Sequence, residues 1–137
     1  MTKETKLSAF SFEGFLISET HITRKEGKQG KFKIDLTPSG KYIKKLKQFR
    51  LNLEVRVYDE KSFEAIIKTQ SLFEFKEDVN ESEIGTYFYV NSSAIIFPYI
   101  RAYISALTAL SGLKTITIPT MNLTGLGEKL KRKTTFD

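Results

Sequence analysis

The chain has 137 residues, of which 40% are hydrophobic and 28% charged, a composition typical of one soluble globular domain with a modest core. The formal net charge is +6, and the absence of cysteine excludes disulfides, thiolate metal sites and a cysteine nucleophile. No apolar signal core follows Met1, and together with the missing cysteine this predicts a cytoplasmic protein.

The first predicted strand covers residues 10–23 and carries apolar side chains on both faces. Strict alternation puts Phe10, Phe12 and Leu16 on one face, and Phe15 and Ile17 on the other. Apolar groups on both faces predict either burial on both sides or an outer face that binds a partner.

A polar connector is predicted over residues 24–40, with turn signals at 27–30 and 38–40. Between these turns, Phe32, Ile34 and Leu36 alternate with charged residues, which predicts an extended segment with one apolar side. Residues 51–58 and 63–75 then alternate clearly between apolar and polar side chains. They are the predicted hairpin of an antiparallel sheet with one covered face.

One long apolar helix is predicted before Gly112. Its apolar side chains recur at spacings of three and four residues: Tyr99, Ile100, Tyr103, Ile104, Leu107 and Leu110. Ser92 or Ser93 is the predicted N-cap, and Pro98 predicts that the helix begins near it or kinks there. Because Pro98 and Arg101 interrupt the apolar run, a membrane span is not predicted.

The helix also carries four small residues, Ala94, Ala102, Ala106 and Ala109, which allow another helix to approach closely. After it, residues 115–118 are predicted to be extended, and residues 123–130 to form a short helix. Residues 131–137 are predicted to be a flexible basic tail of this single domain. Strands that precede helices predict an α+β fold, with an antiparallel sheet and helices on one side.

Charge is unevenly distributed along the chain. Residues 74–83 contain five acids, whereas residues 24–50 contain ten basic residues against Glu26 and Asp35. The basic run is either a set of solvated loops or a site for a polyanion such as nucleic acid. The candidates for polyanion binding are Lys41, Lys44, Lys45 and Lys47.

Residue clusters for catalysis are missing from the sequence. His21 is the only histidine, and no spacing of acidic residues and histidine is typical of a metal site. The glycines of Gly125-Leu-Gly127 lack the lysine and hydroxyl residue of a phosphate-binding loop. The sequence therefore predicts no enzyme, no catalytic residue, no metal and no cofactor.

Two motifs around the long helix resemble the SecB family of export chaperones. Ile95-Ile-Phe-Pro-Tyr-Ile-Arg101 is similar to the family's helix motif, and Ile118-Pro-Thr-Met-Asn122 with Leu126 is similar to the segment that opens its second helix. Upstream, residues 33–36 resemble the family's crossover loop and residues 51–75 its central hairpin. The resemblance covers roughly residues 10–130.

The resemblance implies a four-stranded antiparallel sheet, with a long helix and a short C-terminal helix packed on one face. It also implies a homotetramer, built as a dimer of dimers, that holds non-native polypeptides without ATP. Long-helix residues Tyr103, Leu107 and Leu110 would pack the body and the contact between dimers. Client contacts would fall on apolar residues in segments that look too short to bury them: Ile34, Leu36, Leu123, Leu126 and Leu130.

The resemblance leaves several partners open. One is the preprotein translocase motor, which docks on an acidic surface in the family, whereas here Glu19 is nearly alone and Ile66 falls near an expected acid. A dedicated chaperone of one partner, such as an antitoxin, is an alternative. Two other functions are also open: nucleic-acid binding through the basic run, and a role as an assembly subunit that reuses the fold.

Overall fold

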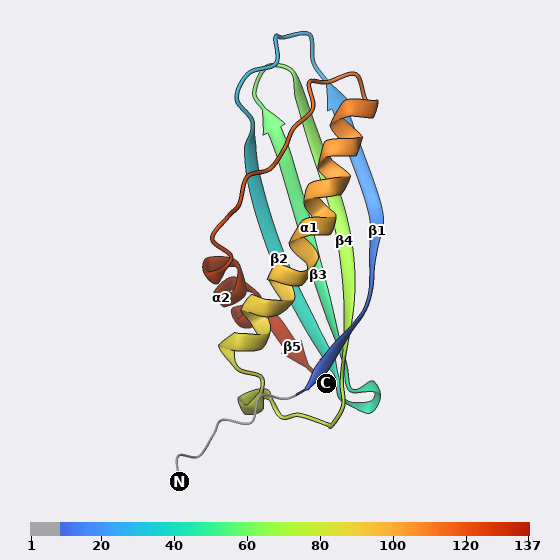
Figure 1. Cartoon of the computed structure of the whole chain (residues 1–137), viewed down its shortest axis with the longest axis vertical. Helices are drawn as coiled ribbons and strands as arrows, with labels where there is room; N and C mark the ends of the chain where they lie inside the picture. Colours follow the sequence, from blue (N-terminus) through green and yellow to red (C-terminus); the bar gives the residue numbers. More distant parts are fainter. Residues whose placement is uncertain (1–8) are drawn as a thin grey trace.

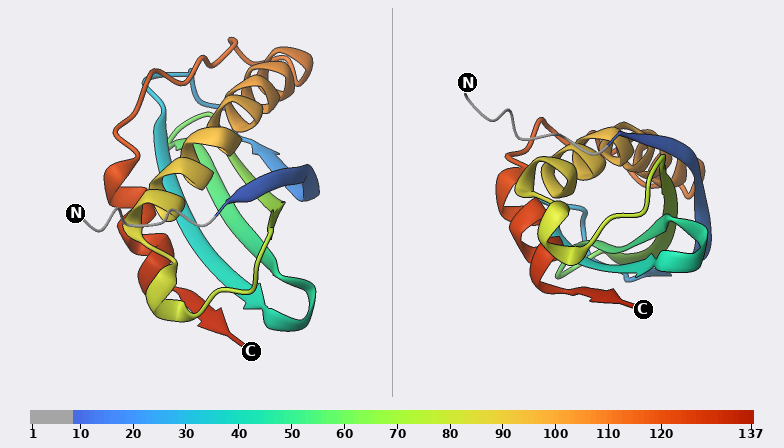
Figure 2. Two further views of the ribbon diagram at one scale, coloured as in Figure 1. Left: turned by 60° about the horizontal axis from the view of Figure 1, so that its bottom comes forward. Right: turned by 90° about the horizontal axis from the view of Figure 1, so that it is seen from below.

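The computed structural model describes residues 9–137 and contains one five-stranded sheet with two helices on its concave face (Figures 1 and 2). In spatial order the strands are β1 (Phe10–Arg24), β4 (Phe63–Phe75), β3 (Gln48–Asp59), β2 (Lys33–Ile43) and β5 (Thr134–Phe136). The helices are α1 (Thr86–Leu110) and α2 (Thr124–Arg132), and two short 3₁₀ turns are η1 (Lys44–Leu46) and η2 (Glu81–Glu83). The predicted α+β fold and the predicted hairpin are therefore confirmed.

The sheet differs from the prediction of four antiparallel strands, because it has five strands and is mixed. Gly40–Tyr42 of β2 pair in parallel with Thr134–Phe136 of β5, in the segment predicted to be a flexible tail. The strand is too short to show a periodic pattern in sequence. Its position depends on tertiary contacts: Phe136 packs against the core, and the N–H of Gly40 donates to the carbonyl of Lys133.

Strand β1 does not alternate strictly, because its pairing with β4 shifts register between Phe12 and Gly14 and between Ile17 and Glu19. Each shift is a β-bulge, which inserts one residue and moves the following side chains to the other face. As a result, Phe12, Phe15 and Ile17 all lie opposite inward-facing β4 residues and pack against the core. Leu16 instead lies on the outer face and is 46% exposed.

Strand β2 runs through the residues predicted to turn at 38–40. Pro38 pairs with Leu53, and because β5 borders β2 only from Gly40 to Tyr42, β2 is an edge strand at Pro38, where a missing N–H is tolerated. Gly40 is needed for packing, since a Cβ there would collide with the ring of Phe49 and the hydroxyl of Thr134.

Helix α1 crosses the concave face diagonally and buries Ile96, Phe97, Ile100 and Ile104 in the core (Figure 1). It begins earlier than predicted: Gly85 is the N-cap, and Pro98 lies inside the helix. The predicted caps Ser92 and Ser93 lie buried within the helix, where both hydroxyls donate to the carbonyl of Tyr89. The cap prediction was wrong because the apolar residues before them also pack on the sheet, which extends the helix.

By length and composition α1 could cross a membrane, with a mean hydropathy of 1.4 over its most apolar window. A third of that window is buried against the sheet. Helices in the cores of globular proteins reach the same length and mean hydropathy.

Candidate functional site

Apolar side chains are incompletely covered where α1 faces β1. Tyr99 of α1 stacks on Phe15 of β1 with ring centroids 5.2 Å apart, and it lies 5.6 Å from the ring of Phe12, yet it remains 47% exposed. Together with Ile95 and Tyr87, these residues form what we call the open flank: Phe12, Phe15, Tyr87, Ile95 and Tyr99. In the described part of the chain, no element lies over this flank.

The open flank continues into a depression of about 630 Å³ beside the first turns of α1. Its wall combines aromatic and aliphatic side chains with two polar groups: Phe10, Phe12, Tyr87, Ile95, Asn91 and Lys76. Such a surface suits apolar side chains of an extended peptide, whose backbone would meet the few polar groups.

The predicted oligomer residues of α1 take different positions. Tyr103 is half-buried and shares a hydrogen bond of 2.7 Å with the hydroxyl of Thr20, which ties α1 to β1 beyond the open flank. Leu107 is half-buried against the core, whereas Leu110 is 88% exposed. Two of the three thus pack the body of the domain, and Leu110 is free to meet another surface.

On the opposite side, where α1 faces β2, the segment between the two helices covers the sheet. This linker, residues 111–123, runs beside β2 (Figure 1) and buries Ile116 and Ile118. A row of α1 side chains holds it: the Nε of Arg101 donates to the carbonyl of Ile118 at 2.7 Å, and the hydroxyl of Ser105 donates to that of Ile116 at 2.9 Å. The Arg101 of the family-like motif therefore fixes the linker.

The five predicted client contacts lie on this covered flank, which we define as Ile34 and Leu36 of β2, the linker 111–123 with Leu123, and Leu126 and Leu130 of α2. Ile34 and Leu36 point to the helix side of β2 and, like Leu123, are partly buried against the core. The expectation that the short segments leave all five exposed is wrong for Leu126 and Leu130, which are 8% and 0% exposed. Their burial follows from α2 packing against both α1 and β2, with Gly127 close to the backbone of Val90. A role in client binding stays a prediction for all five.

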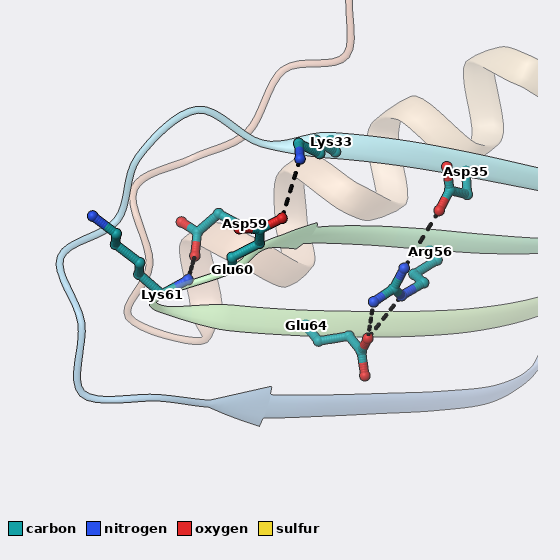
Figure 3. A network of polar contacts seen from close by, with 7 residues as sticks. All are labelled: Lys33, Asp35, Arg56, Asp59, Glu60, Lys61 and Glu64. Carbon is teal, nitrogen blue, oxygen red and sulfur yellow. Dashed lines mark hydrogen bonds and ion pairs between the residues drawn. The ribbon is translucent and has the colours of Figure 1, made fainter.

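The outer face of the sheet carries paired charges. Glu19 lies 3.1 Å from Lys68 and 3.6 Å from His21, and the hydrogen bond and charge of Lys68 lower the pKa of Glu19. Arg56 pairs with Glu64 at 2.7 Å and with Asp35 at 3.5 Å, which links β2, β3 and β4 (Figure 3). Because Glu19 is paired within the chain, this face presents little net negative charge at the first strand.

The predicted polyanion residues are divided between paired and unpaired lysines. Lys41 lies 3.9 Å from Asp137, and Lys44 lies 3.4 Å from Asp78, so acids of this chain offset part of the positive potential around them. Lys45 is exposed, and Lys47 takes a left-handed conformation at the end of η1. Among residues 9–137, no group of three or more histidine and acidic residues is arranged to hold a metal ion.

The model of the SecB family, described as preprotein translocase subunit SecB, matches residues 7–133. The chain belongs to the SecB family. This confirms the resemblance and supports a chaperone rather than an enzyme, because the family is not enzymatic. No curated protein sequence matches the chain significantly.

Among solved structures, the fold is similar to that of the Mycobacterium tuberculosis Rv1957 SecB-like chaperone, in complex with a ChAD peptide from the Rv1956 HigA1 antitoxin. The TM-score is 0.72 at 16% identity, covering 82% of this chain and 88% of that chain. A protein of unknown function from Streptococcus agalactiae aligns over 82% of this chain and 98% of that chain, with a TM-score of 0.46 and 10% identity.

Sequence reasoning missed most of the open flank. The signal was present in the phenylalanines of residues 10–15, but a strict period of two assigned them to opposite faces. Tyr99 was identified only as a member of the helix stripe, because its exposure depends on what lies beside the helix.

Proposed function

We propose that the protein is an ATP-independent holdase that binds non-native polypeptides in the cytoplasm through the open flank. The observation that carries this proposal is the exposed aromatic surface of Phe12, Phe15 and Tyr99, with the depression that continues from it. Membership of the SecB family supports the same class of function. Each buried side chain contributes about 1.5–3 kcal/mol at most, so a client binds through several weak apolar contacts.

Light scattering from an aggregating, chemically unfolded protein tests this proposal, with the purified chain at equal concentration and no ATP. We expect suppression that persists at about 0.3 M salt, because salt at that strength screens surface charge but not apolar contact. Tyr87→Ser with Tyr99→Ser should remove most of the suppression, and Leu16→Ser on the outer face is the matched control. If neither the wild type nor the control variant suppresses aggregation at any ratio, the protein is not a general holdase.

A dedicated chaperone of one partner is the second candidate. It is favoured by the likeness to a SecB-like chaperone whose structure contains an antitoxin peptide. Such a protein protects its own partner and leaves unrelated unfolded proteins to aggregate. Testing three unrelated unfolded proteins separates the two candidates, since a general holdase suppresses the aggregation of all three.

We further propose that copies of the chain assemble into a tetramer through the solvent side of α1. That side exposes Leu110 and a row of small residues: Pro98, Ala102, Ala106 and Ala109. Small residues let a second helix approach closely, and an exposed leucine adds apolar contact. Sedimentation should give a mass near four chains, and Ala106→Glu should reduce it. A wild-type mass of one chain contradicts this assembly.

A further inference from the structure

The loops at the tip of the sheet are fixed to one another by backbone hydrogen bonds. The N–H of Lys25 donates to the carbonyl of Ser62 at 2.7 Å, and the N–H of Gly27 donates to that of Lys61 at 2.9 Å. Gly27 lies so close to Lys61 that a Cβ would collide with its carbonyl. The β1–β2 loop therefore has a defined position against the β3–β4 turn.

Asp59 fixes the same place from within. Its buried carboxylate accepts hydrogen bonds from the N–H groups of Gly30 and Lys61 and from both the N–H and the hydroxyl of Ser62. Figure 3 shows the bond from Lys61. Burial acts to raise the pKa of Asp59, but these hydrogen bonds outweigh it and hold the pKa well below its usual range. The carboxylate of Asp59 is therefore ionised and hydrogen-bonded to both loops.

The end of α1 closes the third side of the tip. The side chain of Gln29 both donates to the carbonyl of Lys114 at 3.1 Å and accepts from its N–H at 2.8 Å. Arg24 donates to the carbonyl of Ser111 at 2.9 Å. The β1–β2 loop is therefore held by both the β3–β4 turn and the turn after α1.

This rigid tip carries a concentration of lysines. A depression of about 270 Å³ is lined by four of them, with Gly30 and two carboxylates: Lys28, Lys31, Lys33, Lys61, Asp59 and Glu60. Glu60 pairs with Lys33 at 3.3 Å (Figure 3). Among residues 9–137, no carboxylate pairs with Lys28, Lys31 or Lys61. We call these three residues the basic tip.

The surroundings favour carboxylates over nucleic acid as the group that the basic tip attracts. Nucleic-acid grooves combine positive charge with aromatic rings on which bases stack, and no aromatic ring lines this depression. Lysines on fixed loops act as point charges for flexible acidic side chains. Two carboxylates face four lysines in the depression, and Glu60 is paired with Lys33 while hydrogen bonds from the loops hold Asp59 in place, so an excess of positive charge remains.

We propose that the basic tip binds acidic segments of the polypeptides that the open flank holds. The tip lies at the end of the sheet where α1 ends, so an extended client that follows α1 reaches it (Figure 1). A client with an acidic segment is thereby bound at two places: its apolar side chains at the open flank, and its carboxylates at the basic tip. This inference rests on the proposed function and adds a preference among clients.

Fluorescence anisotropy with matched peptides tests the preference. One labelled peptide joins an apolar segment to four glutamates, a second replaces the glutamates by glutamines, and a third contains eight glutamates alone. Three exposed ion pairs of modest strength predict about tenfold tighter binding of the first peptide than the second at 50 mM salt. We expect the difference to shrink strongly at about 0.3 M salt.

The test variant is Lys28→Gln with Lys31→Gln and Lys61→Gln, which should abolish the preference and leave binding of the glutamine peptide unchanged. The matched control is Lys45→Gln with Lys129→Gln and Lys131→Gln, which removes the same charge from exposed positions outside the depression. The control should keep the preference within about twofold. Thermal unfolding of both variants checks that each is folded.

Three outcomes overturn the proposal: no preference for the glutamate peptide, equal loss in test and control variants, or tighter binding of a single-stranded polynucleotide that the test variant removes. The glutamine peptide reports separately on the open flank. If it fails to bind while the eight-glutamate peptide binds through the basic tip, the holdase proposal fails and the electrostatic site stands.

Discussion

The two flanks of α1 differ in what lies over them. On the β2 side, the linker, α2 and β5 fill the space, and hydrogen bonds from α1 hold the linker in place. On the β1 side, the described chain leaves Tyr99 stacked on Phe15 and 47% exposed. Apolar residues therefore have opposite roles on the two flanks: they stabilise the fold on one, and on the other they are available to a partner.

The two flanks also differ in which of their apolar residues a client can reach. Family resemblance points to Leu126 and Leu130 as client contacts, whereas both are buried in the chain's own core. A client could reach them only if α2 moved away from α1 and β2. The open flank needs no such movement.

The largest expected effect is on stability and concerns the covered flank. Leu130→Ala should lower the free energy of unfolding by about 2–5 kcal/mol, because it leaves a cavity at a fully buried position. Urea denaturation measures the loss. Tyr99→Ala on the open flank is the comparison and should cost much less. A loss at Leu130 below that at Tyr99 would mean that α2 is not packed in solution.

The second effect concerns the tip. Asp59→Asn should lower the free energy of unfolding by about 1–3 kcal/mol at pH 7, since it replaces a buried acceptor of several hydrogen bonds. The folded pKa of Asp59 is lowered, so its stabilisation is fully present above the unfolded value of about 3.9 and is lost as pH falls further. The gap between wild type and variant should therefore narrow from pH 5 to pH 2.5. A constant gap across that range contradicts an ionised, hydrogen-bonded Asp59.

A smaller effect is expected where α1 holds the linker. Arg101→Met should cost about 0.5–1.5 kcal/mol, the usual net contribution of one hydrogen bond, and should speed amide exchange in residues 111–123. Ser105→Ala removes the neighbouring bond to Ile116 and should accelerate exchange in the same segment. If amide exchange became faster only on the open flank and stayed unchanged in residues 111–123, Arg101 would not be the residue that holds the linker in place.

Sequence patterns predicted the strands and helices well where the pairing is regular. Residues 51–58 and 63–75 alternate as β3 and β4 do, because each faces the core on one side without interruption. The bulges in β1 escaped prediction because nothing in the local sequence requires an inserted residue. Pro38 and Gly40 were interpreted as a turn because proline and glycine are typical turn residues. The edge position of β2 and the contact of Gly40 with the ring of Phe49 appear only in the tertiary structure.

The candidate site was harder to predict than the fold. The apolar residues of both helices are visible in the sequence, but which of them stay uncovered depends on the path of the linker and on β5. The basic run was visible too, yet the sequence pointed to Lys41, Lys44, Lys45 and Lys47, and the first two pair with acids distant in sequence. The lysines of the basic tip come together only because the β1–β2 loop folds onto the β3–β4 turn.

Photo-crosslinking of a radiolabelled, permanently unfolded polypeptide tests the central claim most directly. A photoreactive phenylalanine analogue takes the place of Tyr99 on the open flank or of Leu36 on the covered flank, and the yield of crosslinked client is compared at about 0.3 M salt. We predict a strong crosslink from position 99 and a weak one from position 36. A strong crosslink from position 36 with none from position 99 would contradict the account and place the client on the covered flank.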